Sequence, residues 1–140
     1  MVLVDSSIWI EAARRQGDLM AKLGLRALLN EQEALLCSPV LLEVLGGARR
    51  EERAALQADL ACLPYVRVTE TDYLAAVHHL WRLRDAGVVV PNNDVLIATL
   101  ALRLQCRVYA RDRHFEVMSR LLGFALYEPG YGGSYRRDGA

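Results

Sequence analysis

Four acidic residues occur at positions where a carboxylate is unfavourable unless something compensates its charge: Asp5, Glu43, Asp94 and Asp112. Each of them follows, begins or interrupts a run of apolar residues, so each is expected next to a buried part of the fold, where an unpaired charge is costly. Two carboxylates about 4 Å apart repel by about 4 kcal/mol at an effective dielectric constant of about 20. If the four gather in one place, they must take up protons, bind a cation or receive an arginine from a partner.

The chemistry of these side chains indicates which cation they would bind. Carboxylates without cysteine or histidine partners select hard cations, so Mg²⁺ or Mn²⁺ is the expected ion. His78 and His79 are adjacent in a predicted helix and are expected to be surface or core residues. His114 follows Asp112 by two residues, and the sequence leaves open whether this histidine binds metal.

Each acid also has a purely structural interpretation. Asp94 and Asp112 could cap the helices that follow them, which is the commonest use of aspartate at such positions. Asp5 could accept hydrogen bonds from backbone amides. Glu43 is harder to explain in this way, because it lies beyond the first turn of its predicted helix and its neighbours in the stretch 39–45 are all apolar. Glu43 is therefore the acid that most strongly indicates a function.

Short apolar runs, bounded by turn and cap residues, predict the strands that would position these acids. The runs are residues 2–4, 34–37, 65–68 and 107–110, with 124–126 as a weaker fifth. Because they alternate with helical patterns, they predict a three-layer α/β/α fold around a short central parallel sheet of four to five strands. Parallel strands end at one edge of the sheet, so Asp5 and Asp112 would share that edge. Helices that start there would bring Glu43 and Asp94 to the same place.

Cap and turn residues predict where the helices begin. The predicted starting positions are Ser6 or Ser7, Asp18, Ser38 with Pro39, Glu51, Thr69 and Asp112. Asn92 or Asn93 is predicted to cap a further helix from about Asp94 to Gln105. Thr69 and Asp72 have the spacing of a capping box, and the segment 88–93 is predicted to be a linker. The second helix is expected to bury Leu19, Leu23, Leu25, Leu28 and Leu29.

The length and composition favour one small cytoplasmic domain. Of the 140 residues, 1–128 are expected to form the domain and 129–140, rich in glycine, a flexible tail. No apolar run approaches the roughly 20 residues that cross a bilayer, and the N-terminus lacks a signal-peptide pattern. The three cysteines lie in apolar stretches and are expected to be reduced core residues, not disulfides or zinc ligands: Cys37, Cys62 and Cys106.

The net charge is zero, with 17 basic and 17 acidic side chains, and does not by itself indicate a nucleic-acid-binding protein. If four acids belong to one site, the remaining 13 face 17 basic side chains, which leaves a surplus of four positive charges elsewhere. All basic residues except Lys22 are arginine. Arginine suits phosphate because its planar group donates two hydrogen bonds at once, although a GC-rich genome would also favour arginine codons.

Four motifs carry a resemblance to a known family. They are Val4–Ile10 (VDSSIWI), Ser38–Val44 (SPVLLEV), Asn93–Thr99 (NDVLIAT) and Arg111–Phe115 (RDRHF). Together they span almost the whole chain in an order and spacing that resemble the PIN-domain family, and more closely the VapC-type toxins of bacterial toxin–antitoxin pairs. One such motif is a weak signal, whereas four in register are fairly specific.

The resemblance implies a PIN-like fold and a ribonuclease that uses Mg²⁺ or Mn²⁺ to cleave phosphodiester bonds in RNA. It also implies a homodimer, or a toxin–antitoxin hetero-oligomer, neutralised by a small VapB-like antitoxin whose C-terminal segment wraps the toxin. By motif position the acidic quartet, which would bind the metal and catalyse cleavage, is Asp5, Glu43, Asp94 and Asp112, with Ser6 as a polar neighbour.

The chain departs from the family pattern at two positions. Many relatives have a second acid where this chain has His114, which leaves open whether one or two metal ions bind. Ser6 stands where threonine is common, and it keeps the hydroxyl group. Arg111 and Arg113 are the arginines nearest to Asp112 in sequence and are candidate contacts to the RNA backbone.

The same acids would also suit two other functions. A phosphoryl-transfer domain also uses acids at strand ends with Mg²⁺, but it normally needs a lysine, and Lys22 lies in an early helix far from the proposed edge. A non-catalytic binding module could use the same acids to recognise arginines of a partner. Metal-dependent cleavage of RNA separates the ribonuclease from the binding module.

Overall fold

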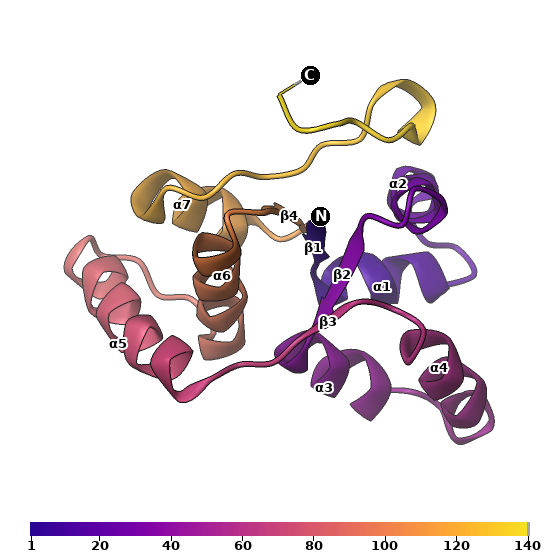
Figure 1. The fold of residues 1–140 in the computed structure, drawn as a ribbon, viewed down its shortest axis with the longest axis horizontal. Helices are drawn as coiled ribbons and strands as arrows, with labels where there is room; N and C mark the ends of the chain where they lie inside the picture. Colours follow the sequence, from indigo (N-terminus) through magenta and orange to yellow (C-terminus); the bar gives the residue numbers. More distant parts are fainter. Residues whose placement is uncertain (140) are drawn as a thin grey trace.

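Four short parallel strands form the centre of the computed structural model, which describes residues 1–139 (Figure 1). They are β1 (Val2–Val4), β2 (Ala34–Cys37), β3 (Tyr65–Val66) and β4 (Arg107–Tyr109), in the spatial order β3-β2-β1-β4. The predicted parallel α/β sheet is confirmed. The weaker fifth strand is not formed: it is reduced to an isolated bridge between Leu126 and Val108.

Seven α-helices surround the sheet in the described residues. They are α1 (Ser6–Ala13), α2 (Leu19–Asn30), α3 (Ser38–Gly46), α4 (Arg53–Leu60), α5 (Glu70–Asp85), α6 (Asn92–Leu104) and α7 (Arg113–Leu122). Two short 3₁₀ turns, η1 (Arg50–Glu52) and η2 (Tyr131–Gly133), complete the elements. In Figure 1, α5, α6 and α7 lie to the left of the strands, α1 and α2 lie to the right, and α3 lies below them with α4 beside it.

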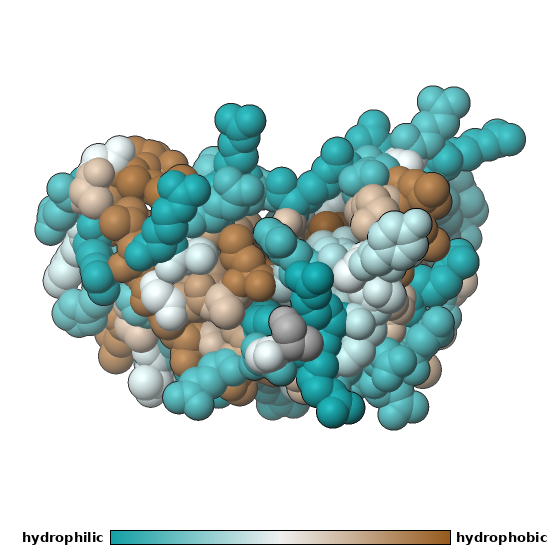
Figure 2. Space-filling view, turned by 90° about the horizontal axis from the view of Figure 1, so that it is seen from above, coloured by the Kyte–Doolittle hydropathy of each residue, from teal (hydrophilic) through white to brown (hydrophobic). Residues whose placement is uncertain are grey.

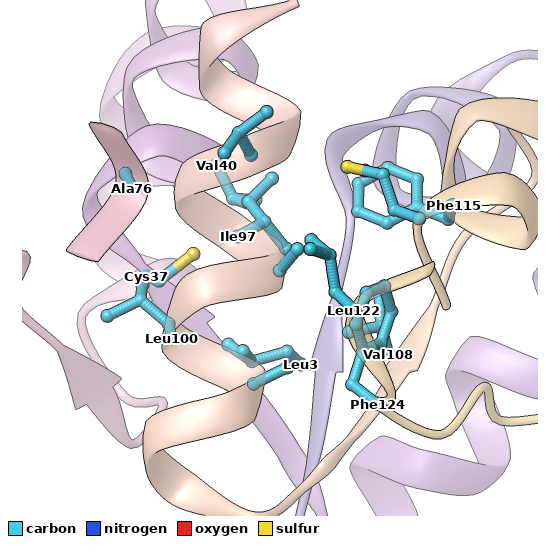
Figure 3. Packing of buried hydrophobic residues seen from close by; sticks show 14 of the residues in the cluster. Leu3, Cys37, Val40, Ala76, Ile97, Leu100, Val108, Phe115, Leu122 and Phe124 are labelled. Atoms are coloured by element: carbon cyan, nitrogen blue, oxygen red, sulfur yellow. The ribbon is translucent and has the colours of Figure 1, made fainter. Parts of the chain in front are cut away.

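Strand β1 is buried on both faces because its side chains alternate between two apolar clusters. Val2 and Val4 belong to the cluster that includes Ile8 of α1 and Leu28 of α2. Leu3 belongs to the larger cluster, which α6 and α7 line with residues such as Ile97, Leu100 and Phe115 (Figure 3). The end of β1 is thereby fixed from both sides, and so is the position of the residue that follows it.

Aspartates start two of the helices that leave the sheet. Asp5 is the N-cap of α1 and Asp112 is the N-cap of α7. Helix α1 begins at Ser6, one of the two starting positions that the sequence predicted, although its N-cap is Asp5 and not a serine. The capping box of Thr69 and Asp72 at the start of α5 is confirmed. Asp112 therefore has the capping role that the sequence offered as its alternative explanation, and Asp5 accepts the backbone N–H of Ser7, as its own alternative proposed. Asp94 lies inside the first turn of α6 and does not cap it, so the capping explanation was wrong for Asp94.

Helix α6 begins earlier than predicted. It starts at Asn92, with Pro91 as its N-cap and no side-chain cap, so neither Asn92 nor Asn93 caps it. Proline presets φ near the helical value, here −61° at Pro91, and so favours entry into the helix at the next residue. The early start leaves the side chain of Asn93 free for another contact. Similarly, α3 is capped by Cys37, with Pro39 in its first turn.

The buried side of α2 differs from the predicted row of leucines. Its buried residues are Ala21, Gly24, Leu25 and Leu28, whereas Leu19 and Leu29 are exposed. Gly24 explains the shift: a Cβ there would clash with the hydroxyl of Tyr109 and with Pro129. The helix therefore packs through its small residues, which turns Leu19 and Leu29 outward.

The cysteines are free thiols, as predicted, but only one belongs to the core. Cys37 is buried, Cys106 is partly buried and Cys62 is exposed, so the expectation of three core cysteines was wrong for Cys62. Helix α4 ends at Leu60, and Cys62 follows it on the surface. Burial raises the pKa of the Cys37 thiol to about 12, which keeps that thiol protonated.

The segment after residue 128 lies against α2 and the amino edge of the sheet. Tyr127 contacts the rings of Tyr109 and Tyr135, with ring centroids 5.2 and 6.4 Å away. The buried guanidinium of Arg107 lies 5.0 Å from the centre of the Tyr127 ring and donates a hydrogen bond of 2.8 Å to the carbonyl of Arg136. The sequence called this segment a flexible tail, and its flexibility stays a prediction beside these contacts.

The surface on the side of the C-terminal segment mixes polar and apolar areas (Figure 2). Hydrophilic side chains project over much of this face, with hydrophobic patches between them. Among the described residues, 1–139, no helix combines the length and apolar character needed to cross a membrane.

Candidate active site at the carboxyl edge of the sheet

The carboxylate of Asp5 is held on one oxygen only. Its Oδ2 accepts hydrogen bonds from the backbone N–H of Ser7 (3.1 Å) and from the Ser7 hydroxyl (2.6 Å). Its Oδ1 is buried and has no hydrogen-bond partner among the described residues. Only 3% of Asp5 is exposed, so an acceptor without a partner is costly here and indicates a ligand.

Glu43 projects from the second turn of α3 and is held on both oxygens. Its Oε2 accepts a hydrogen bond of 2.8 Å from the hydroxyl of Ser6, and its Oε1 accepts one of 3.1 Å from the side-chain amide of Asn93. Helices α1, α3 and α6 therefore meet at this carboxylate. Ser6 is a polar neighbour of the site, as the family pattern implies, and its partner is Glu43.

Asp94, Asp112 and His114 form a compact group between the starts of α6 and α7. The imidazole Nδ1 of His114 lies 3.2 Å from Oδ2 of Asp94 and 3.1 Å from Oδ1 of Asp112. One potential ligand atom from each of the three residues lies within 4.8 Å of the others. His114, whose role the sequence left open, is thus in direct contact with two members of the quartet.

One open cleft brings the four predicted acids together. It has a volume of about 640 Å³, and its lining includes Asp5, Glu43, Asp94, Asp112 and Ser6. The four acids come from four separate segments of the chain, at or near the carboxyl edge of the sheet. The arrangement agrees with the placement that parallel strands predicted.

The carboxylates in this cleft make one another harder to ionise. Burial raises the pKa of Asp5, and the charge of Glu43 adds to this effect. Burial raises the pKa of Asp94 to about 6, and the charges of Asp5 and Asp112 contribute in the same direction. A hydrogen bond from His114 opposes this rise without cancelling it. The cluster therefore lacks positive charge.

A divalent cation fits the donors that line the cleft. It would supply the missing positive charge, and the free Oδ1 of Asp5 would be an available ligand atom. Carboxylate oxygens are the donors that Mg²⁺ and Mn²⁺ take in proteins. Two observations support this fit. Oδ1 of Asp5 is a buried acceptor without a hydrogen-bond partner among the described residues, and the pKa values of Asp5 and Asp94 are raised.

The two arginines proposed to contact RNA lie in different surroundings. Arg111 Nη1 lies 2.9 Å from Oε1 of Glu11 and 3.6 Å from Oδ2 of Asp18, so its guanidinium is already held by acids of α1 and of the α2 cap. Arg113 is exposed and forms no ion pair with any residue of the described chain, 1–139. Of the two, Arg113 has the guanidinium that is free for a phosphate.

Sequence reasoning missed two supporting residues. Ser7 was considered only as a helix start, although it stands beside Ser6 and binds Asp5. Asn93 was interpreted as a possible cap, but it binds Glu43 instead. The signal that was available for both is proximity: each is adjacent in sequence to a residue of the site. Their partners could not be predicted, because these depend on how α1, α3 and α6 are oriented.

Comparison with known proteins identifies a family. The sequence profile of the PIN domain matches residues 2–121. Ribonuclease VapC11 of Mycobacterium tuberculosis H37Rv is 36% identical over 126 residues, which cover 86% of this chain and 93% of that protein. Ribonuclease VapC32 of the same strain is 33% identical over 131 residues, which cover 91% of this chain and 98% of that protein.

A solved structure shows the same fold at low sequence identity. The structure of VapBC2 from Rickettsia felis, bound to a DNA fragment from its promoter, matches with a TM-score of 0.72 at 20% identity. The match covers 91% of this chain and 98% of that one.

Proposed function

The chain belongs to the PIN-domain family, and on this basis we propose that it is a metal-dependent endoribonuclease that acts as the toxin of a toxin–antitoxin pair. The two relatives described above are named ribonucleases and match over nearly their whole length. The observation that carries the proposal is the cleft in which Asp5, Glu43, Asp94 and Asp112 meet, with one Asp5 oxygen free.

The four acids would have two different roles in the site. Asp5, Asp94 and Asp112 would hold Mg²⁺ or Mn²⁺, and Glu43 would complete the set of ligands or orient a water molecule. When bound, the cation would polarise the scissile phosphate and make the attacking water more acidic. Glu43 is suited to orientation because Ser6 and Asn93 fix both of its oxygens.

Arginines beside the cleft would hold the RNA backbone. Arg113, in the first turn of α7 beside Asp112, presents an exposed guanidinium that could donate two hydrogen bonds to one phosphate. Arg111 would be a weaker contact, since Glu11 and Asp18 already pair with it. Phosphate contacts give affinity without sequence preference, so the RNA target must be chosen elsewhere on the surface.

A small antitoxin is the proposed protein partner. The VapBC2 structure from Rickettsia felis is of a complex, and an antitoxin of the VapB type would neutralise this chain in the cytoplasm. The assembly would be a homodimer or a toxin–antitoxin hetero-oligomer. Residues 1–128 would form the catalytic domain, with 129–140 as its tail.

The test is cleavage of total RNA by the purified protein with Mg²⁺, with Mn²⁺ or with EDTA. Asp5→Asn and Asp94→Asn should fold normally and lose cleavage, whereas Asp59→Asn on the exposed face of α4 should keep it. Fragments that need metal and vanish in both site variants would support the proposal. Cleavage that persists in Asp5→Asn, or a folded protein that cleaves no RNA with either metal, would contradict it and favour a binding module.

A further inference from the structure

His114 stands in contact with two acids of the proposed metal site, at a position where its imidazole can serve as a ligand. We propose that the imidazole of His114 joins the carboxylates of Asp94 and Asp112 as a ligand, beside Asp5, so that the site binds a first-row transition-metal ion and the protein binds Mn²⁺ in preference to Mg²⁺. This inference rests on the proposed metal-dependent function, and it specifies the ligand set and the class of ion.

The distances between the donor atoms match a coordination sphere. Two adjacent ligands of an octahedral ion with bonds of about 2.1 Å lie about 3 Å apart. The Nδ1 atom of His114 lies 3.2 Å from Asp94 Oδ2 and 3.1 Å from Asp112 Oδ1, which is the spacing of two adjacent ligand pairs. Only small side-chain movements would be needed for one ion to contact all three atoms.

A second observation at the same cleft points to a cation independently of this group. Asp5 lines the cleft beside Asp94 and Asp112, is almost completely buried, and has an Oδ1 atom that accepts no hydrogen bond from the described residues. A hydrogen bond between His114 and Asp94 does not satisfy this oxygen. A bound cation would satisfy it.

The imidazole decides which cation is preferred. Mg²⁺ binds oxygen donors almost exclusively and gives up its water ligands reluctantly, whereas imidazole suits the first-row transition metals. Replacing an acid by histidine also removes one negative charge from the site, which weakens purely electrostatic binding of Mg²⁺. Both effects favour Mn²⁺ over Mg²⁺ at this position.

The other two histidines provide the contrast. His79 Nδ1 lies 2.9 Å from the hydroxyl of Thr99, and that hydroxyl donates to the carbonyl of Val95, so His79 is a structural donor between α5 and α6. His78 is exposed on α5, where its ring packs edge-on against Trp81, with centroids 5.2 Å apart. Within residues 1–139, neither forms a hydrogen bond or ion pair with an acid of the quartet, as His114 does, and His78 is therefore a matched control for His114.

The experiment measures Mn²⁺ binding by the full-length protein with electron paramagnetic resonance. The signal of free Mn²⁺ gives the dissociation constant, and pulsed measurements detect coupling between the bound ion and a ¹⁴N nucleus. Wild type and His78→Ala should show this coupling, and His114→Ala should lose it together with about tenfold or more in Mn²⁺ affinity. His114→Asp, with oxygen donors alone, should lose the coupling and bind Mg²⁺ at least as well as wild type.

Two outcomes would overturn the inference. One is bound Mn²⁺ without nitrogen coupling in the wild type, and the other is unchanged Mn²⁺ affinity in a folded His114→Ala protein; either would leave His114 as a hydrogen-bond partner only. RNA cleavage is assayed separately on the same samples. Nitrogen coupling without cleavage would refute the nuclease and leave the mixed-ligand site intact, so the two failures are distinguishable.

Discussion

The hydroxyl of Ser7 lies 2.6 Å from Oδ2 of Asp5 and fixes which of the two carboxylate oxygens remains free. The same hydroxyl accepts a hydrogen bond of 3.1 Å from the backbone N–H of Arg111, the residue before Asp112. One small side chain therefore joins the turn after β1 to the turn after β4. Ser7 positions two acids that are more than 100 residues apart in the sequence.

Ser7→Ala should lower metal-dependent cleavage by about 10- to 100-fold, the range for losing a residue that orients a metal ligand. Ser7→Thr, which keeps the hydroxyl, should restore most of the activity. Affinity for Mn²⁺ should fall in parallel with cleavage, which a general loss of stability would not produce. Ser119→Ala, in α7 and away from the cleft, is the control. Full activity of Ser7→Ala would show that Asp5 needs no such support.

The raised pKa of Asp94 predicts that the metal-free protein loses stability as the pH rises. The ordinary value is 3.8 and burial raises it to about 6 in the folded protein, so between these values the unfolded chain has released a proton that the folded chain still holds. Each unit of difference corresponds to about 1.4 kcal/mol, which gives a penalty of about 3 kcal/mol that is complete above the folded pKa. Below pH 4 the penalty is absent.

The side chain in Asp94→Asn cannot ionise, so the stability difference between this variant and the wild type measures the penalty. In EDTA, the free energy of unfolding in urea should rise in Asp94→Asn relative to wild type as the pH increases from 4 to 7. A difference between the two proteins that stays constant over this range would mean that Asp94 ionises normally. Added Mg²⁺ or Mn²⁺ should reverse the effect at pH 7, because the wild type binds the ion and Asp94→Asn does not.

Breaking the ion pair between Arg103 and Asp72 should lower the stability of the protein without changing RNA cleavage. Arg103 Nε donates to Oδ1 of Asp72 at 2.7 Å and Nη2 donates to Oδ2 at 3.0 Å, while the Asp72 side chain is only 2% exposed. The hydrogen bonds from Arg103 hold the pKa of Asp72 below its ordinary value even though burial works in the opposite direction.

Arg103→Ala should therefore lower the free energy of unfolding by about 2 kcal/mol at pH 7, since it leaves a buried carboxylate with only its cap contacts. Arg120→Ala, exposed on α7, should change it by less than about 0.5 kcal/mol. Cleavage measured below the unfolding temperature should be unaffected in both. An Arg103→Ala protein as stable as Arg120→Ala would disprove this account of the pair.

Two neighbouring glycines test whether the C-terminal segment rests on α2 in solution. Gly132 (φ 64°) and Gly133 (φ 82°) both have left-handed conformations, so alanine is strained at either position. A Cβ on Gly133 would also meet the Cβ of Leu23 at 2.5 Å, whereas a Cβ on Gly132 would meet no atom within 4 Å.

Gly133→Ala should destabilise the protein by about 1–3 kcal/mol more than Gly132→Ala, the usual cost of forcing an extra methyl group into a packed site. Thermal or urea unfolding measures the difference. Equal, small effects would mean that the segment is detached from α2 most of the time, in agreement with the flexible tail that the sequence predicts.

The sequence revealed the acids because each lies in a local context that is informative by itself. An aspartate directly after a buried strand, or a glutamate inside an apolar helix, stands out without knowledge of the fold. Parallel strands then imply a common edge, and the cleft containing Asp5 and Asp112 follows.

What the sequence did not predict depends on contacts between distant elements. Leu19 and Leu29 are exposed because Gly24 lets α2 approach Tyr109, and a leucine row alone cannot report this approach. The pairing of Ser6 with Glu43 requires the orientation of α1 against α3. Helix α6 starts early because Pro91 directs the chain, so Asn93, which resembled a cap, binds Glu43 instead.

The pairing of β1 with β4 has a consequence for the order of synthesis. Val2 is in register with Arg107 and Val4 with Tyr109, so β1 has both of its neighbours only after β4, the last of the four strands along the chain, has been synthesised. Asp94 and Asp112 also belong to the final third of the chain. A nascent polypeptide that ends before Asp94 would therefore lack two of the four acids of the cleft and a flanking strand of its sheet. Activity that depends on all four acids would therefore begin only after translation has passed Asp112.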